Sequence, residues 1–249
     1  MKATVYERVL FGLSAVVAGV VMLVRHDSDM WQRLAPLWTP LATLIVWSFS
    51  VALVASGLAI ISPRTARVGS LVLAGVYIVL SLACFQDIIG APAQAGSYVE
   101  IFELFSVACG ALALYALTNT GTQRNLGLVR FTRLAFGVCT LSFAWAQVAF
   151  FAYTSSLVPV WVPPNQAFWT TLTTIAFALA GIAMLINVRA LLAFRLSALM
   201  MGLFGLLVWV PHIIAQPAQL SNWTEISANY LMTAAAWIVG NASSSVEAT

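Results

Sequence analysis

Long apolar segments, almost free of charged residues, recur along this chain of 249 residues. About 18 apolar residues in a row are enough for a helix to cross the hydrocarbon core of a bilayer. Within hydrocarbon, only helices and closed barrels pair all of their backbone hydrogen-bonding groups. The segments lack the alternation of apolar and polar residues that is typical of barrel strands. The sequence therefore predicts an all-α integral membrane protein, and a content of 61% hydrophobic and 8% charged residues agrees with this.

Eight transmembrane helices are predicted. They fall near residues 9–24, 41–61, 68–86, 99–117, 133–153, 166–186, 191–210 and 223–240. Pro63 follows the second segment, and because proline cannot continue a helix we expect that helix to end just before it. The first segment has the length of the apolar region of a signal peptide. We expect it to be retained, because it corresponds to an internal span at 133–153.

The second half of the chain repeats the first at a spacing of about 125 residues. Residues 88–101 read IIGAPAQAGSYVEI, and residues 213–226 read IIAQPAQLSNWTEI. Shorter flanking segments repeat in the same order, such as RVLFG at 8–12 and RLAFG at 133–137. Each copy contains four predicted spans, an even number, so both copies are expected to insert in the same direction.

The repeat predicts the domain organisation. We expect two tandem parallel-repeat four-helix bundles, at 1–118 and 131–249, joined by a cytoplasmic linker at 119–130. Parallel repeats in a membrane are related by a pseudo-two-fold axis along the membrane normal. The repeated loops of both copies should then open on the same side of the membrane.

Lysine and arginine residues indicate which helix ends face the cytoplasm. With a cytoplasmic N-terminus, nine of the eleven basic residues fall on cytoplasmic segments, and only Arg25 and Arg33 fall outside. Most acidic residues fall on or near the outer side. We therefore predict that both termini are cytoplasmic. The basic balance then reflects topology and attraction to the anionic inner leaflet of the bilayer, and no nucleic-acid partner is expected.

Several short motifs mark the helix ends of each copy. Residues 34–40 read LAPLWTP and residues 56–67 read SGLAIISPRTAR, while the second copy has LVPVWVP at 157–163 and AGI at 180–182. The second copy departs from the first by having NVR at 187–189 in place of the PRTAR segment.

These motifs resemble the DoxX-like family of small four-helix membrane proteins, so the chain resembles two fused members. The resemblance implies a bacterial or archaeal cytoplasmic membrane. It also implies a non-catalytic or quinone-contacting subunit of a membrane redox assembly, with quinone as the candidate cofactor. A soluble or membrane redox partner on the outer face would then join the lipid bilayer as a partner. No catalytic residue carries over, because none of the matching positions belongs to a catalytic motif.

The sequence offers no self-sufficient catalytic motif. Its three cysteines form no Cys-x-x-Cys pair and are expected to be apolar packing residues. The only lysine is Lys2, which excludes a Schiff base within a span, and two histidines are too few for paired haem ligation. No cluster of residues has the spacing of metal ligands.

Acidic residues at the outer ends of the spans are the first candidate ligand-binding residues. Glu100 and Glu103 are three residues apart, so they share one helix face. Acids within a membrane are often functional, although a carboxylate at a helix start can also be a plain interfacial group. Asp87 and His212 occupy equivalent positions before the repeated loops. They would either form a titratable pair in one crevice between the copies or remain separate interfacial residues.

Polar and aromatic residues of the loops complete the candidate set. Gln94 and Gln219 are equivalent, and their side chains are expected either to satisfy the loop backbone or to border the same crevice. Trp38 and Trp161 lie near the outer boundary, where tryptophan forms aromatic belts and can also line a crevice for a quinone or lipid tail. We expect the two loops to fold alike and the acids that follow, such as Glu100, to cap their helices.

Three classes of function remain open: a subunit of a redox assembly, a small-solute transporter or channel, and a structural anchor for another protein. The spans hold few polar groups, which argues against an aqueous path for transport. The main ones are Gln147, Thr170, Thr171, Thr173, Thr174 and Asn229.

Overall fold

The computed structural model describes residues 5–25, 42–118 and 125–247 and consists of helices joined by short turns. Trp38 lies outside the described residues. The elements are α1 (Val5–Arg25), α3 (Ala42–Ile61), α4 (Ala66–Ala83), α5 (Phe85–Gly90), α6 (Ala95–Thr118), α7 (Leu126–Ala149), α8 (Phe151–Leu157), α9 (Gln166–Ile186), α10 (Ala190–Phe204), the π-helix η2 (Gly205–Trp209), α11 (Val210–Ala215) and α12 (Leu220–Glu247).

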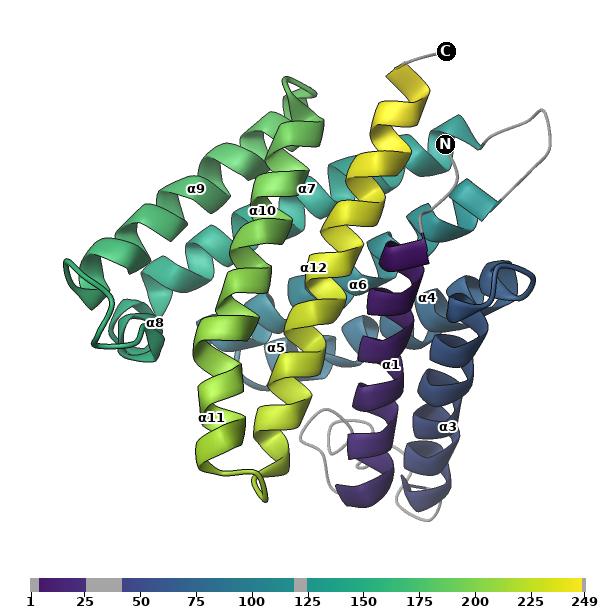
Figure 1. The fold of residues 1–249 in the computed structure, drawn as a ribbon, viewed down its shortest axis with the longest axis horizontal. Coiled ribbons are helices and arrows are strands. Elements are labelled where there is room, and N and C mark those ends of the chain that lie inside the picture. The colour runs from purple at the N-terminus through teal and green to yellow at the C-terminus, as the bar shows by residue number, and fades with distance from the viewer. Residues whose placement is uncertain (1–4, 26–41, 119–124, 248–249) are drawn as a thin grey trace.

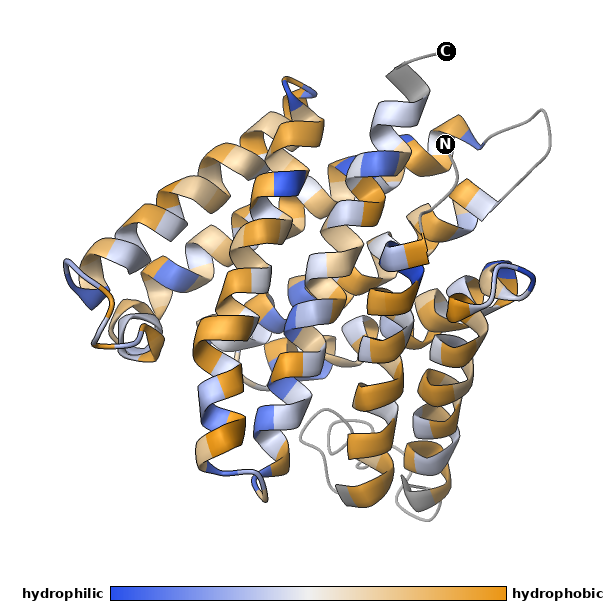
Figure 2. Ribbon diagram, viewed as in Figure 1, coloured by the Kyte–Doolittle hydropathy of each residue, from blue (hydrophilic) through white to orange (hydrophobic). Residues whose placement is uncertain are grey.

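Seven helical segments of the described chain are long and apolar enough to cross a membrane, which confirms an α-helical integral membrane protein. They are Val5–Val24, Leu44–Ile61, Ala66–Gly90, Ala95–Thr118, Leu126–Ala149, Gln166–Ile186 and Ala190–Ala215. The remaining long helix, α12, is less hydrophobic, and Figure 2 shows hydrophilic residues along its length. This helix packs against α1, α6, α7 and α10. Because other helices cover it, its polar side chains can face protein instead of lipid.

By their contacts, the long helices form a closed ring in which each packs against the next. Figure 1 shows α12 between α10 and α1. The order around the ring follows the chain from α1 to α12, and α12 then packs back against α1. In addition, α6 and α12 pack against each other across the middle of the ring. The contact of α1 with α12 therefore has a counterpart in the contact of α7 with α6.

Glycines allow two helix pairs at corresponding places in the repeat to approach closely. A Cβ atom added to Gly12 in α1 would lie 2.5 Å from the carbonyl oxygen of Gly57 in α3. A Cβ atom added to Gly181 in α9 would lie 3.0 Å from the carbonyl oxygen of Gly137 in α7. Small residues at helix crossings are the usual means of close packing in membranes. The repeated glycines thus make the same kind of contact in both halves.

The central pair, α6 and α12, meets at corresponding residues. A Cβ atom added to Gly110 would lie 2.3 Å from the Cβ atom of Ala235 and 2.6 Å from its Cα atom. These two residues are separated by the repeat spacing, so each helix presents the same position to the other. Such a contact between corresponding positions is what a two-fold axis requires.

The two Pro-Ala-Gln loops have the same backbone geometry, as the repeat predicts. The φ and ψ angles are −145° and 68° at Ala91, and −140° and 67° at Gln216. Both residues end a short helix by donating a backbone hydrogen bond four residues back, to Asp87 at 2.8 Å and to His212 at 2.9 Å. We call the end of the bundle that carries residues 91–94 and 216–219 the Pro-Ala-Gln end.

Aromatic side chains close these loops. Tyr98 Oη donates a hydrogen bond to the carbonyl oxygen of Pro92, and Trp223 Nε1 donates one to that of Pro217, each at 3.1 Å. The glutamine side chains make no hydrogen bond to any described residue, so the prediction that they satisfy the loop backbone is wrong.

The acids after the loops do not cap their helices, contrary to the sequence prediction. The helices α6 and α12 begin at Ala95 and Leu220, and neither has an acidic residue in its first turn. Glu100 and Glu225 lie in the second turn, beyond most of the unpaired N–H groups of the helix start. The prediction fails because each helix begins about four residues earlier than its apolar segment.

The third long helix of each half is interrupted at corresponding residues. In the first half α4 ends at Ala83 and α5 begins at Phe85, whereas in the second half the π-helix η2 separates α10 from α11. Pro211 follows η2 and cannot donate the backbone hydrogen bond of a regular helix. Phe204, the last residue of α10, lines the candidate site together with residues of α12.

Candidate binding cavity

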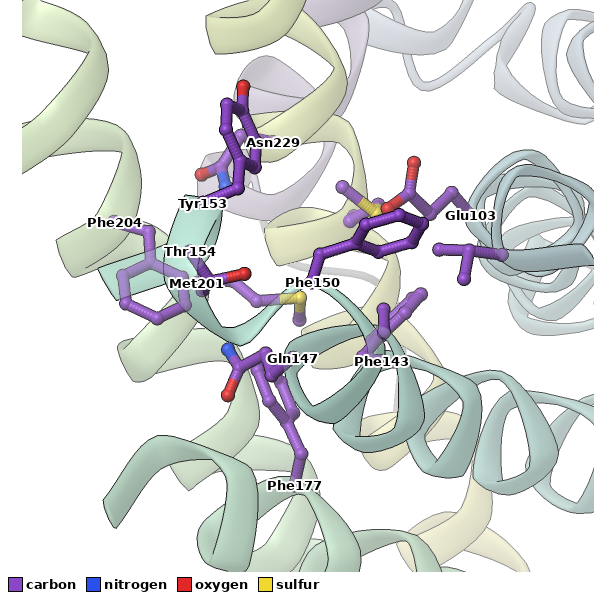
Figure 3. A pocket seen from close by; sticks show the side chains of 13 residues that line it. Glu103, Phe143, Gln147, Phe150, Tyr153, Thr154, Phe177, Met201, Phe204 and Asn229 are labelled. Atoms are coloured by element: carbon purple, nitrogen blue, oxygen red, sulfur yellow. The ribbon is translucent and has the colours of Figure 1, made fainter. Parts of the chain in front are cut away.

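A cavity of about 390 Å³ lies between α6 of the first half and the helices of the second half, in the part of the bundle nearer the Pro-Ala-Gln end. Figure 3 shows Glu103 on one side of it and Gln147, Thr154 and Phe204 on another. Its volume falls within the range of small-molecule sites. The side chains that line it come from α6 to α10 and from α12, and are Val99, Glu103, Phe143, Ala146, Gln147, Phe150, Tyr153, Thr154, Phe177, Met201, Phe204, Asn229 and Met232.

Aromatic rings form much of the cavity wall. Phe143 and Phe177 contact edge to face, with ring centroids 5.8 Å apart, and Phe177 is 6.5 Å from Phe204. Phe150 and Tyr153 add two further rings from the start of α8. Aromatic faces attract cations within about 6 Å as well as flat apolar groups.

Glu103 is the only acidic or basic side chain among the residues that line the cavity. It lies eight residues after the start of α6, about 12 Å along the helix at 1.5 Å per residue. Its carboxylate makes no hydrogen bond or ion pair with any described residue, although its backbone carbonyl accepts one from Ser106 Oγ. An intramembrane carboxylate without a partner is costly, which indicates a functional role.

Gln147 is held by two threonines of α9. The hydroxyl groups of Thr173 and Thr174 lie 3.1 Å and 2.8 Å from Gln147 Oε1 and donate to it. These contacts fix the carboxamide, and its Nε2 end remains to face the cavity. Gln147 therefore offers a hydrogen-bond donor in a fixed orientation.

Asn229 is a buried amide without a partner. Its side chain is only 9% exposed, and its Oδ1 atom makes no hydrogen bond with the described residues. It borders the main cavity and also a second cavity of about 90 Å³, shared with Thr154 and Phe204. A buried polar group normally finds a partner, so an unpartnered one beside a cavity points to a bound molecule.

Three carboxylates gather where α6 and α12 enter the bundle, and we call Glu100, Glu103 and Glu225 the acid cluster. The carboxylate of Glu103 interacts electrostatically with those of Glu225 and Glu100, and Glu225 also interacts with Glu100. Glu225 has the most exposed side chain of the three. No group of three metal-ligating side chains in the described residues could hold a metal ion.

The equivalent region of the first half is an apolar core. At the repeat spacing, Gln147 corresponds to Met22 and Asn229 to Leu104, both of which are buried. Glu103 corresponds to Ala228. Each of these polar groups of the cavity therefore has an apolar residue at the corresponding position of the repeat.

Of the eight residues predicted from the sequence to bind a ligand, Glu103 lines the cavity and Glu100 lies beside it in the acid cluster. Gln94 and Gln219 lie exposed in their loops, and Trp161 is 69% exposed between α8 and α9. None of these three side chains lines the cavity.

Asp87 and His212 lie in the short helices α5 and α11 and take no part in the cavity lining. His212 Nδ1 is 2.7 Å from the carbonyl oxygen of Val208, and its ring packs against Trp209 at 5.8 Å. The carbonyl oxygen of His212 accepts a hydrogen bond from Asn222. A shared crevice for Asp87 and His212 stays a prediction.

Sequence reasoning missed the role of Gln147 and Asn229, although both stood out as polar residues within spans. Polar residues this few do not predict an aqueous path for transport, but α7 and α12 bring these two to one cavity with Glu103. The aromatic wall gave no sequence pattern, because its rings come from four separate helical segments.

The three cysteines are free and buried, as predicted. The chain matches no protein-family model, no curated protein and no solved structure. The resemblance to the DoxX-like family therefore stays a prediction, and the function has to be argued from the cavity itself.

Proposed function

We propose that this membrane protein binds a small lipophilic organic cation in the cavity between α6 and the helices of the second half. The observation that carries the proposal is the Glu103 carboxylate, which has no partner among the described residues and faces a cavity walled by aromatic rings. A cation in this cavity would meet a carboxylate and several ring faces, the two kinds of group that attract it most strongly away from water.

The surrounding charge favours a cation over an anion or a neutral ligand. Glu100 and Glu225 add negative charge beside Glu103, and the lining residues include no basic side chain. Gln147 and Asn229 would orient polar atoms of the ligand through hydrogen bonds. Uptake or transport of such a cation is the function class that this site supports best.

A quinone-contacting subunit of a redox assembly is a second proposal, supported by the same aromatic wall. A quinone ring is flat and apolar, and Gln147 Nε2 could donate a hydrogen bond to one of its carbonyl oxygens. The acid cluster distinguishes the two proposals, because a neutral quinone gains nothing from three nearby carboxylates.

We expect the purified protein to bind methyltriphenylphosphonium at pH 8 at least tenfold more tightly than triphenylphosphine oxide, a neutral molecule of similar shape. The reason is the charge-assisted contact with Glu103, since tenfold in affinity needs about 1.4 kcal/mol. Isothermal titration calorimetry in detergent measures both constants, and a soluble ubiquinone analogue tests the second proposal in the same assay.

The matched variants are Ala146→Phe, which fills the cavity, and Leu179→Phe, which adds the same side chain on the exposed face of α9. Only Ala146→Phe should remove binding. Equal affinity for the cation and the neutral molecule, or equal loss in both variants, would contradict cation binding in this cavity.

We further propose that α12 also crosses the membrane, which gives eight spans in two parallel repeats with both termini cytoplasmic. Asn241 near the end of α12 donates a hydrogen bond to Glu7 near the start of α1, so the chain begins and ends at one end of the bundle. With 28 residues, α12 is about 42 Å long, enough to span the bilayer. The predicted orientation places the Pro-Ala-Gln end outside.

Cysteine labelling tests this topology. Ala93→Cys and Ala218→Cys, both exposed in the Pro-Ala-Gln loops, should react with an impermeant maleimide added outside intact cells. Arg64→Cys, in the turn between α3 and α4, should react only after permeabilisation. The native cysteines are buried, and the labelling of the wild-type protein gives the background signal. Reaction of only one of the two loops from outside would contradict parallel repeats.

A further inference from the structure

The acid cluster lies between the cavity and the Pro-Ala-Gln end. Glu103 lines the cavity, while Glu100 lies three residues nearer the start of α6. On α12, Glu225 lies four residues before Asn229, so both are on one face of that helix. Asn229 is the buried, unpartnered amide at the cavity, which indicates independently that this place holds a ligand.

The remaining titratable groups around Glu103 offer no positive charge. Among the helices packed against α6, α12 contributes Glu225, α5 carries Asp87, and α4 carries Tyr77. The one basic residue of α4, Arg67, contacts Tyr115 near the other end of α6. Between Arg133 and its end at Ala149, α7 carries no charged residue. The cavity side of α8 adds only the Tyr153 phenol. Within the described residues, a positive charge at this place has to come from a ligand or a proton.

Glu103 makes no ion pair with a described residue and interacts electrostatically with Glu225, so within a membrane these two carboxylates are not both ionised unless a proton or a cation joins them. We infer that the organic cation and a proton compete for the acid cluster, so that each bound cation releases a proton from it. This inference rests on the proposed cation binding. In the exchange, the cluster gives up a proton to the aqueous phase, and the carboxylate left behind pairs with the cation.

Competition of this kind links affinity to pH with a fixed sign. At low pH the proton occupies the carboxylate that would pair with the cation, so the affinity for the cation falls as the pH falls. If one proton leaves for each cation that binds, the dissociation constant for the cation rises by up to about tenfold for each unit by which the pH is lowered. This holds over the pH range in which the cluster is protonated.

The experiment measures methyltriphenylphosphonium binding to the detergent-purified protein between pH 5 and pH 9, together with the protons released into weakly buffered solution. The wild-type protein should release close to one proton per bound cation at the acidic end of this range. Glu103→Gln should bind weakly, with an affinity that no longer changes with pH. The neutral triphenylphosphine oxide should release no proton with either protein.

The outcomes separate this inference from the proposed function. If the cation binds at every pH with one affinity and releases no proton, the exchange is wrong and cation binding stands. If no cation binds at any pH while the protein remains folded, the proposed function itself fails. A second variant, Glu225→Gln, keeps the cavity lining intact. If its affinity for the cation changes with pH as in the wild-type protein, Glu225 takes no part in the proton exchange.

Discussion

Replacing Glu103 by glutamine is expected to weaken methyltriphenylphosphonium binding at pH 8 by about thirtyfold, which corresponds to the loss of about 2 kcal/mol from a charge-assisted contact. Glutamine keeps nearly the same shape, so the loss reports the charge and not the packing. Calorimetric dissociation constants for the wild-type and variant proteins check the prediction.

The control for this prediction is Glu103→Asp, which keeps the charge and shortens the side chain by one methylene. It should recover most of the lost affinity, and the affinity for triphenylphosphine oxide should stay the same in all three proteins. Undiminished cation binding by Glu103→Gln would show that the carboxylate has another role. A loss of folded protein, seen by size-exclusion chromatography, would instead assign Glu103 to stability.

Gly110→Val is expected to have the largest effect on stability, because its side chain would occupy space held by the backbone of Ala235. The Cβ atom alone would lie 2.6 Å from the Ala235 Cα atom, so α6 and α12 would have to move apart. Overpacking of a rigid contact costs about 3 kcal/mol, equivalent to a fall in Tm of roughly 6–12 °C. Thermal unfolding followed by tryptophan fluorescence measures this change.

Gly75→Ala in α4 provides the matched control, because no other heavy atom lies within 4 Å of its added Cβ. Alanine favours the helix over glycine, so Tm should stay the same or rise slightly. A Gly110→Val protein as stable as Gly75→Ala would mean that α6 and α12 do not cross at this point.

The sequence predicted the class of fold because hydropathy alone decides it. A charge-free apolar run that is long enough to span a bilayer and lacks strand-like alternation is expected to form a membrane-spanning helix, and the helices α3, α4 and α9 lie close to their predicted segments. Helix ends were less predictable: α6 and α7 begin four and seven residues before the predicted spans, because polar residues near a membrane surface can still be helical. The linker predicted at 119–130 is shortened accordingly, since α7 begins at Leu126.

The site was only partly predictable, because apolar helices give little information about which face meets which neighbour. Glu103 stood out as an acid within a span, and Gln147 and Asn229 as rare polar residues. Their convergence depends on how α6, α7 and α12 are rotated and crossed. The small residues at Gly110 and Ala235 set that crossing, and they are too common in membrane helices to be recognised in advance.

The contact of Gly110 with Ala235 also has an evolutionary consequence. A single unit of the repeat, standing alone, would leave this face of its fourth helix uncovered, and the natural cover is the same face of a second, identical unit. Two copies of such a unit that met in this way would form a homodimer with α6 of each subunit at its symmetry axis. In a homodimer any substitution appears in both subunits, so a polar cavity would have been built twice. Fusion into one chain removes that constraint: Glu103 on α6 can differ from Ala228 at the corresponding position of α12, and the polar cavity is built only once.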